Sequence, residues 1–187
     1  MGFLLLSGAG MPVPTQTGEP AVPLVSYQVA MTAYNAVPSQ TDGDPFTTAS
    51  GAYSNPEVVA ARSRDLKDEL PFGTIIEIDG PTSEQNNCGY TVVSPILGYR
   101  VIADSMNSRF TNRVDVLFST KSNYKRSDGT YVNASTILGV CHDVTVRVIG
   151  HLDPAHMQKL PKTQEELAAL VATTIGPNQG VGVLARK

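Results

Sequence analysis

The sequence lacks a basic excess and long apolar runs, and each absence narrows the classes of protein that it can encode. Its 14 Lys and Arg against 17 Asp and Glu give a formal net charge of -3, so no basic stripe can neutralise the phosphates of a nucleic acid. No stretch approaches the roughly 20 apolar residues of a membrane-spanning helix. We therefore expect neither a nucleic-acid partner nor a transmembrane segment.

Cysteine is scarce, and tryptophan is absent. The two cysteines, Cys88 and Cys141, permit one disulfide if the chain is exported, or two buried or unpaired thiols. The string His151, Asp153, His156 matches no strong zinc signature, and a solvated stretch after the last strand fits it better. Because there is also no phosphate-binding loop and no Ser-His-Asp or Cys-His arrangement, we expect no metal and no cofactor.

The chain divides into three parts. Residues 1–25 form a leader or linker, in which a short apolar run and Ser7-Gly8-Ala9 resemble a weak export signal and a proline-rich stretch follows. Residues 26–150 carry the strand patterns. Residues 151–187 are expected to be a tail with one helix, which opens at the capping box Thr163–Glu166 and runs to about Thr174.

Short alternating segments between turn-rich connections dominate the middle part. They predict strands at 26–34, 74–78, 99–103, 114–118 and 144–150, and a short helix near 134–140. The expected fold class is therefore mainly β, a small closed barrel with one or two short helices. The side chains expected to face its core are Val114, Val116, Phe118, Val144, Val146 and Val148.

Two carboxylates stand among apolar residues in VIADSMNSRFTNRVDVLF (101–118). Strict alternation along a strand places Asp115 on the face opposite Val114, and Asp104 on the face of Ile102. A carboxylate there is costly to desolvate unless it is hydrogen-bonded, paired or on a solvent-lined wall. One interpretation is structural, with Asp104 capping a turn and Asp115 pairing with Arg113 or Arg109. The other is that the two acids share a site.

The elements MTAYNAVPSQTD, TTASG, VVAARSRDLKDELPFGT and VIADSMNSRFTNRVDV, in this order, resemble the three-aspartate (3D) domain. The resemblance covers about residues 28–150. This family includes the catalytic domain of membrane-bound lytic transglycosylase A and cell-wall proteins of resuscitation and sporulation. It implies a six-stranded double-psi β-barrel that acts on peptidoglycan.

By this resemblance, Asp115 is the catalytic acid and base, because it follows Asp104 by the family's spacing of eleven residues. Asp104 becomes the supporting carboxylate, and Asp65 the first of the three aspartates. The sequence departs from the family at two points. Ser-Met-Asn follows Asp104 where the family has Thr-Gly-Gly, and Asp65 needs a small insertion before the Pro-Phe-Gly-Thr corner.

Five further residues match family positions near the cleft or lie between the two acids, and they are candidates for binding substrate: Tyr34, Thr48, Asn107, Asn112 and Arg113. Tyr34 and Thr48 can instead serve in packing and in a turn. For the other three we favour a role in holding the loop backbone.

The resemblance implies a peptidoglycan lytic transglycosylase, which cleaves the MurNAc–GlcNAc β-1,4 bond with a single aspartic acid and leaves 1,6-anhydro-MurNAc ends. The alternatives are a non-catalytic cell-wall glycan-binding module and a barrel hydrolase of β-1,4 glycans with two carboxylates. In each case we expect a monomer that meets peptidoglycan strands in the cell envelope, either periplasmic or secreted.

Overall fold

The computed structural model describes residues 24–81 and 88–175 of the 187-residue chain. The expected leader therefore lies almost wholly outside the described residues. The strands are β1 (Ser26–Asn35), β2 (Val59–Arg62), β3 (Thr74–Asp79), β4 (Arg100–Ser105), β5 (Arg113–Phe118), β6 (Asn123–Lys125), β7 (Tyr131–Asn133) and β8 (Cys141–His151). The α-helices are α1 (Tyr90–Val93), α2 (Ala134–Leu138) and α3 (Gln164–Ile175), and the 3-10 turns are η1 (Arg64–Leu66), η2 (Ser94–Ile96) and η3 (Pro154–Lys159).

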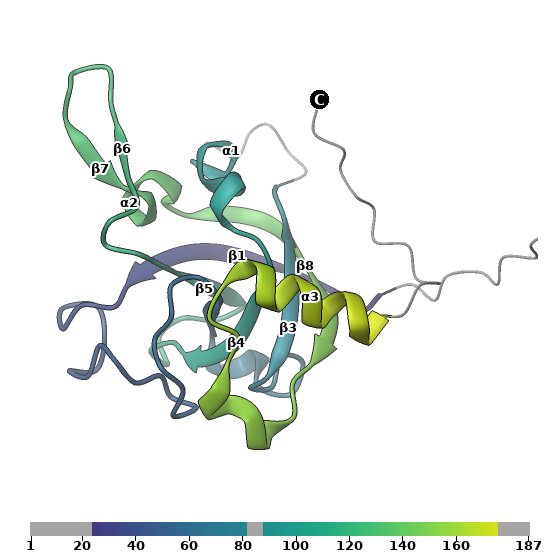
Figure 1. The fold of residues 1–187 in the computed structure, drawn as a ribbon. Helices are drawn as coiled ribbons and strands as arrows, with labels where there is room; N and C mark the ends of the chain where they lie inside the picture. The colour runs from purple at the N-terminus through teal and green to yellow at the C-terminus, as the bar shows by residue number, and fades with distance from the viewer. Residues whose placement is uncertain (1–23, 82–87, 176–187) are drawn as a thin grey trace, which may run out of the picture.

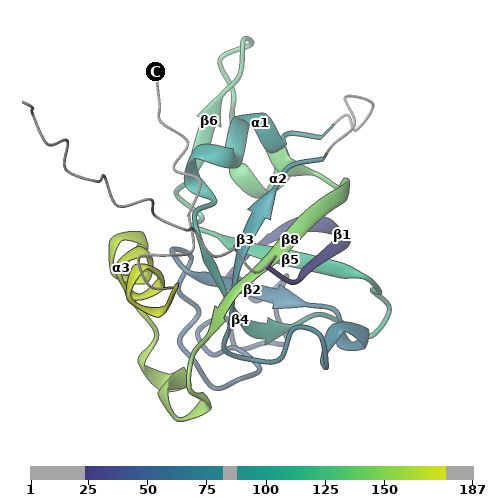
Figure 2. The same ribbon diagram turned by 90° about the vertical axis from the view of Figure 1, so that its right-hand side faces the viewer.

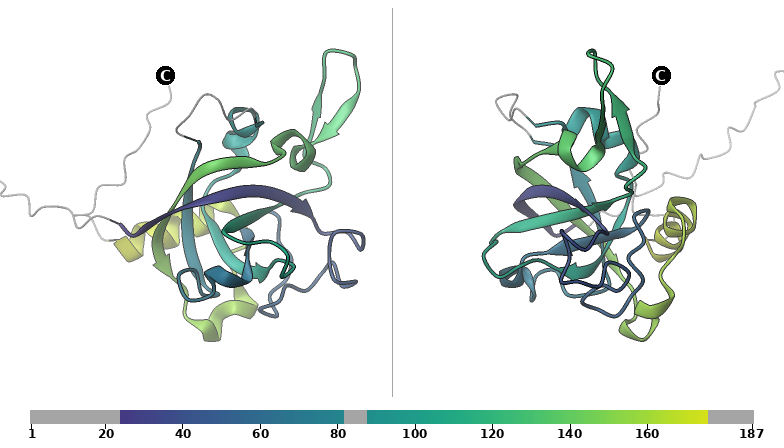
Figure 3. Two further views of the ribbon diagram at one scale, coloured as in Figure 1. Left: turned by 180° about the vertical axis from the view of Figure 1, so that it is seen from behind. Right: turned by 90° about the vertical axis from the view of Figure 1, so that its left-hand side faces the viewer.

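Six of the strands close into a barrel in the order β1-β5-β2-β4-β3-β8 (Figure 1). Two neighbouring pairs are parallel, β1 with β5 and β2 with β4, and the other four contacts are antiparallel. Seen from behind, β1 and β8 run side by side across the barrel (Figure 3). The predicted mainly β fold, with a closed six-stranded barrel, short helices and a C-terminal helix, is confirmed.

The barrel interior is filled by the side chains that alternation predicted. Val114, Val116, Val144 and Val146 have no exposed surface, and Phe118 is 2% exposed. Val148, also predicted to face the core, is only partly buried but packs against this cluster. Fully burying an apolar side chain of this size contributes about 1.5–3 kcal/mol, so these two strands are major contributors to the inner core.

A second apolar cluster lies on the outside of the barrel wall. Leu167 and Val171 of α3 pack there with barrel residues such as Ile75 and Leu117. As a result α3 lies along the outer surface of the barrel (Figure 2). The region after residue 150 was expected to be an appended tail, but as far as Val171 it shares a core with the barrel. At its start, the Thr163 hydroxyl accepts a hydrogen bond from the amide of Glu166, as the capping box predicted.

Three parts of the chain differ from the sequence-based expectation. Strand β2 was not predicted, because its four residues are all buried and show no alternation of apolar and polar types. Residues 79–98, expected to be a polar loop, contain α1 and η2. The expected Ser-Asp-Gly-rich loop after β5 forms the β6–β7 hairpin, which projects from the barrel (Figure 1).

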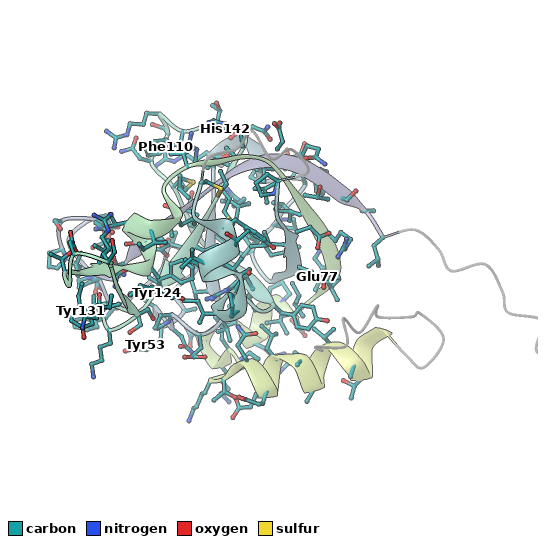
Figure 4. All side chains as sticks on the ribbon, turned by 90° about the horizontal axis from the view of Figure 1, so that it is seen from above. Tyr53, Glu77, Phe110, Tyr124, Tyr131 and His142 are labelled. Atoms are coloured by element: carbon teal, nitrogen blue, oxygen red, sulfur yellow. A yellow bond between two sulfur atoms is a disulfide. The ribbon has the colours of Figure 1, made fainter. Side chains whose placement is uncertain are left out.

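Cys88 and Cys141 form the disulfide that the sequence permits, with their Cα atoms 5.3 Å apart. The bond appears as a yellow link between sulfur atoms close to the labelled His142 (Figure 4). The bond links the segment just before α1 to the first residue of β8. It therefore anchors the long connection between β3 and β4 to a strand of the barrel.

Arg100, at the start of β4, is a buried cation that holds several loops together. Its guanidinium donates hydrogen bonds to the carbonyl oxygens of Leu97 (2.7 Å), Pro56 (2.6 Å), Ile96 (2.9 Å) and Leu117 (3.3 Å). Burial lowers the pKa of Arg100 to about 10, which still leaves it charged at neutral pH. The contacts join β5 and the segment before β2 to the turn that leads into β4.

Candidate active site

Four neighbouring strands each place one residue in a single row on the outer face of the barrel. Thr32 of β1 pairs with Asp115 of β5, Asp115 pairs with Ala61 of β2, and Ala61 pairs with Asp104 of β4. The two aspartates therefore stand on either side of an alanine, with their Cα atoms separated by two strand spacings of about 4.8 Å each. The small Ala61 side chain leaves the space between the two carboxylates open.

A β-bulge brings Asp104 onto this row. On β2 the register advances by one residue, from Ala60 to Ala61, while on β4 it advances by two, from Ile102 to Asp104. The extra residue, Ala103, breaks the alternation, and Asp104 turns to the face of Ala61 and Asp115. The expectation that Asp104 shares the face of Ile102 is therefore wrong, because it assumed an uninterrupted strand.

Asp115 is a partly buried acid with a raised pKa. Its Oδ1 accepts a hydrogen bond of 2.8 Å from the Thr32 hydroxyl, which fixes the orientation of the carboxyl. Burial is the largest influence and raises the pKa of Asp115 to about 6, and the negative charge of Asp104 adds to the rise. The hydrogen bond from Thr32 and the charge of Arg113 oppose it. Near neutral pH this acid can therefore both hold and release a proton.

Asp104 is held as a hydrogen-bond acceptor. Its Oδ1 accepts from the amides of Ala49 (2.9 Å) and Ser105 (2.8 Å), and its Oδ2 accepts from the Tyr34 hydroxyl (2.8 Å). Burial, followed by the nearby charge of Asp104, raises the pKa of Tyr34, so the tyrosine keeps the proton that it donates. Three donors from three segments thus fix Asp104 beside the acid.

Both aspartates line a cleft of about 640 Å³. One wall comes from the loop between β1 and β2, and includes Gln40, Asp42, Asp44 and Thr47. The other wall consists of Arg64, just after β2, Ser105 at the end of β4, and four residues of the loop between β4 and β5: Met106, Asn107, Arg109 and Phe110. Phe110 lies at the edge of the molecule (Figure 4), where this loop borders the cleft.

The structure brings together half of the site residues named from the sequence. The four that line the cleft are Tyr34, Asp104, Asn107 and Asp115. Thr48 is buried beside the cleft, and its hydroxyl donates to the carbonyl of Ala52 within a turn. Thr48 therefore stabilises the loop from which the Ala49 amide reaches Asp104.

The other three predicted residues organise the loop between β4 and β5. Asp65 does not line the cleft, and its Oδ2 accepts a hydrogen bond of 2.8 Å from the Asn112 amide. Asn112 has a positive φ of 45° and donates through its side chain to the carbonyl of Gln28. Arg113 lies 5.1 Å from the centre of the Phe110 ring, and its buried Nε has no hydrogen-bond partner among the described residues. Asn112 and Arg113 agree with the loop-holding role, whereas Asp65, expected as the first of the three aspartates, holds the loop from outside the cleft.

Sequence reasoning missed Thr32, Ala61 and Phe110. Thr32 could have been found, because it stands two residues before Tyr34 on an alternating strand and so shares its face. Ala61 belongs to the unpredicted β2. Phe110 could not be assigned, since only the folded loop brings its ring to the cleft.

A larger groove of about 1010 Å³ lies between the end of β8, η3 and α3. Its two carboxylates are engaged in local structure, because Asp153 accepts from the Ala155 amide and Glu166 from the Lys162 amide. Within residues 24–81 and 88–175, no three His, Cys, Asp or Glu side chains come close enough to hold a metal ion. The smaller cleft is therefore the better candidate for acid chemistry.

No protein-family model matches this sequence, and neither a curated protein nor a solved structure resembles it significantly. Over the part of the chain that the structure describes, no helix is both long and apolar enough to cross a membrane.

Proposed function

We propose that this chain is a peptidoglycan lytic transglycosylase of the three-aspartate type, and that Asp115 is its catalytic acid and base. The observation that carries the proposal is the raised pKa of Asp115, about 6, on a carboxyl that lines an open cleft. The second carboxylate, Asp104, stands on the other side of Ala61 in the same row. The likeness of the sequence around both aspartates to the three-aspartate domain supports the same assignment.

The reaction needs one proton donor and no water-activating base. Asp115 donates its proton to the glycosidic oxygen between MurNAc and GlcNAc, and the C1–O bond breaks. The C6 hydroxyl of the same MurNAc attacks C1 and forms the 1,6-anhydro ring, while the Asp115 carboxylate accepts the hydroxyl proton. The acid is thus restored, and a pKa near the working pH suits a group that must act in both directions.

The neighbours of Asp115 have separate tasks in this proposal. Thr32 orients the carboxyl through its hydrogen bond, and Asp104, fixed by Tyr34 and two amides, supplies a negative charge that opposes ionisation of Asp115. Both Asp104 oxygens already accept hydrogen bonds. These bonds hold the Asp104 carboxylate in place, and the single-acid route requires no covalent bond to it.

A non-catalytic glycan-binding module is the second candidate. The observation that favours it is the Ser105-Met106-Asn107 segment, which replaces Thr-Gly-Gly of the family and lines the cleft with larger side chains. The two candidates differ in whether glycan strands are cut.

Export to the cell envelope, periplasmic or secreted, is part of the proposal. The Cys88–Cys141 disulfide supports it, because structural disulfides persist in oxidising compartments.

The test is incubation with purified peptidoglycan, followed by mass spectrometry of the soluble products. The wild type should release anhydro-muropeptides, and Asp115→Asn should lower their rate of release by about 100-fold or more. Asp143→Asn is the matched control, since Asp143 is exposed on β8, lies outside the cleft and has a positive φ that asparagine tolerates. Products with reducing ends would indicate a hydrolase, and binding without products would indicate the glycan-binding module.

A further inference from the structure

The two walls of the cleft carry charges of opposite sign. Asp42 and Asp44 belong to the wall between β1 and β2, whereas Arg64 and Arg109 belong to the opposite wall. The strand register separates the walls. Asn35, which leads into the acidic wall, pairs with Phe118 at the end of β5. The basic wall borders the start of β5, because the loop with Arg109 leads into β5 and Arg62, just before Arg64, pairs with Val114. A ligand in the cleft therefore meets an electrostatic gradient along the strand direction.

The two arginines are free to bind a ligand. Both are exposed, and among the described residues neither guanidinium takes part in an ion pair or hydrogen bond. The Arg109 guanidinium lies 4.7 Å from the centre of the Phe110 ring, a contact that keeps the cation at the cleft wall. The Asn107 side chain accepts from the Arg109 amide and so fixes the backbone there.

On the acidic wall, Asp44 is hydrogen-bonded within its own loop, between β1 and β2. Asp44 accepts a hydrogen bond of 2.9 Å from the Phe46 amide, and this bond is the main cause of the lowered pKa of Asp44. The wall therefore stays negative and repels an anionic group. On the cleft floor, Asp104 is an acceptor with three donors already in place. An anionic group on a ligand is thus accommodated only at the arginine wall.

We propose that Arg64 and Arg109 bind a carboxylate on the arm at C3 of the MurNAc ring, so that the cleft selects anionic glycan strands over neutral β-1,4 glycans such as chitin. This inference rests on the proposed function and deepens it, because it names the substrate feature and its orientation. The carboxylate has two sources, the stem peptide of intact strands and the lactyl group of strands from which the peptide has been removed. Guanidinium groups suit both, since they bind carboxylates in a bidentate manner.

The experiment compares three glycans: peptide-bearing strands, strands stripped of peptide by an amidase, and chitohexaose. Binding and cleavage of each are measured for the wild type, Arg64→Gln, Arg109→Gln and the double variant, at low and at high salt. Lys125→Gln, which removes an exposed cation on the β6–β7 hairpin outside the cleft, is the matched control.

Each arginine variant should weaken binding and raise KM for an anionic strand about five- to tenfold, with kcat within about twofold, and high salt should reduce the difference. Chitohexaose binding and the Lys125→Gln control should not change. An effect confined to peptide-bearing strands identifies the stem peptide as the source, an effect confined to stripped strands identifies the lactyl carboxylate, and an effect on both shows that the arginines accept either carboxylate. Equal losses on chitohexaose, or no loss on either anionic strand, would overturn the inference. If the wild type binds strands but cuts none, the proposed function fails, while the binding data still decide the role of the arginines.

Discussion

Replacing Asp115 by asparagine should stabilise the fold at neutral pH while it removes the acid. The amide keeps the shape of the carboxyl, and its oxygen can still accept the hydrogen bond from Thr32. What the substitution removes is a charge that the folded protein holds at a cost. The burial that raises the pKa of Asp115 makes the ionised form unfavourable in the native state.

The magnitude follows from linkage between protonation and folding. The folded pKa is about 6, and the ordinary value for an aspartate is 3.8. Below the lower value both states hold the proton, so Asp115 makes no pH-dependent contribution. As the pH rises from 3.8 to about 6, Asp115 loses its proton in the unfolded chain but keeps it in the folded protein. The free energy of unfolding of the wild type therefore falls over this range. At about 1.4 kcal/mol per pKa unit, the loss is at most about 3 kcal/mol above pH 7.

The assay is urea unfolding of both proteins, with the disulfide intact, at intervals from pH 3.5 to 8. Asp115→Asn should gain roughly 2–3 kcal/mol over the wild type above pH 7, and the difference should disappear near pH 3.5. A difference that does not change with pH, or a variant that is less stable throughout, would refute the reasoning. Asp143→Asn, at an exposed position, should show no such pH-dependent gain.

Three further changes test the framework around the acid. Arg100→Met leaves buried carbonyl groups without their donor, so the free energy of unfolding should fall by about 3 kcal/mol or more in chemical denaturation; an unchanged midpoint would contradict the role given to the guanidinium. Replacing Cys88 and Cys141 together by alanine should cost about 4 kcal/mol in the same assay, because the bond closes a loop with a sequence separation of 53; equal stability of the oxidised wild type and the double variant would argue against it. Tyr34→Phe removes a donor from Asp104 and should slow glycan cleavage about tenfold with near-normal folding, whereas wild-type rates would show that this hydrogen bond is dispensable.

Alternation and local motifs were sufficient to predict most of the barrel. The valines of β5 and β8 repeat at every second position over long strands, and the capping box marks the start of α3. Strand β2 carries no such signal, since two alanines stand among four buried residues and both faces are covered. The three-residue strands of the hairpin are too short for a period of two to be recognised.

The pair of aspartates could be predicted, but its geometry could not. The spacing between Asp104 and Asp115 is visible in the sequence, whereas the extra residue at Ala103 only becomes evident when β4 is aligned with β2. The opposite charges of the two cleft walls could not be predicted either. Asp44 and Arg109 are far apart in the chain, and only the folded loops bring them to one cleft. Long-range placement of loop residues depends on the tertiary structure rather than on local pattern.

The bulge at Ala103 makes the direction of Asp104 depend on an irregular stretch of backbone rather than on alternation. Removing Ala103 would place Asp104 directly after Ile102, and regular alternation would then still point the aspartate away from Ile102, toward Ala61 and Asp115. A change that straightens β4 but keeps its length would instead turn Asp104 toward the apolar interior, on the face of Ile102. The acid pair should thus tolerate deletion of Ala103 better than loss of the bulge with all residues retained.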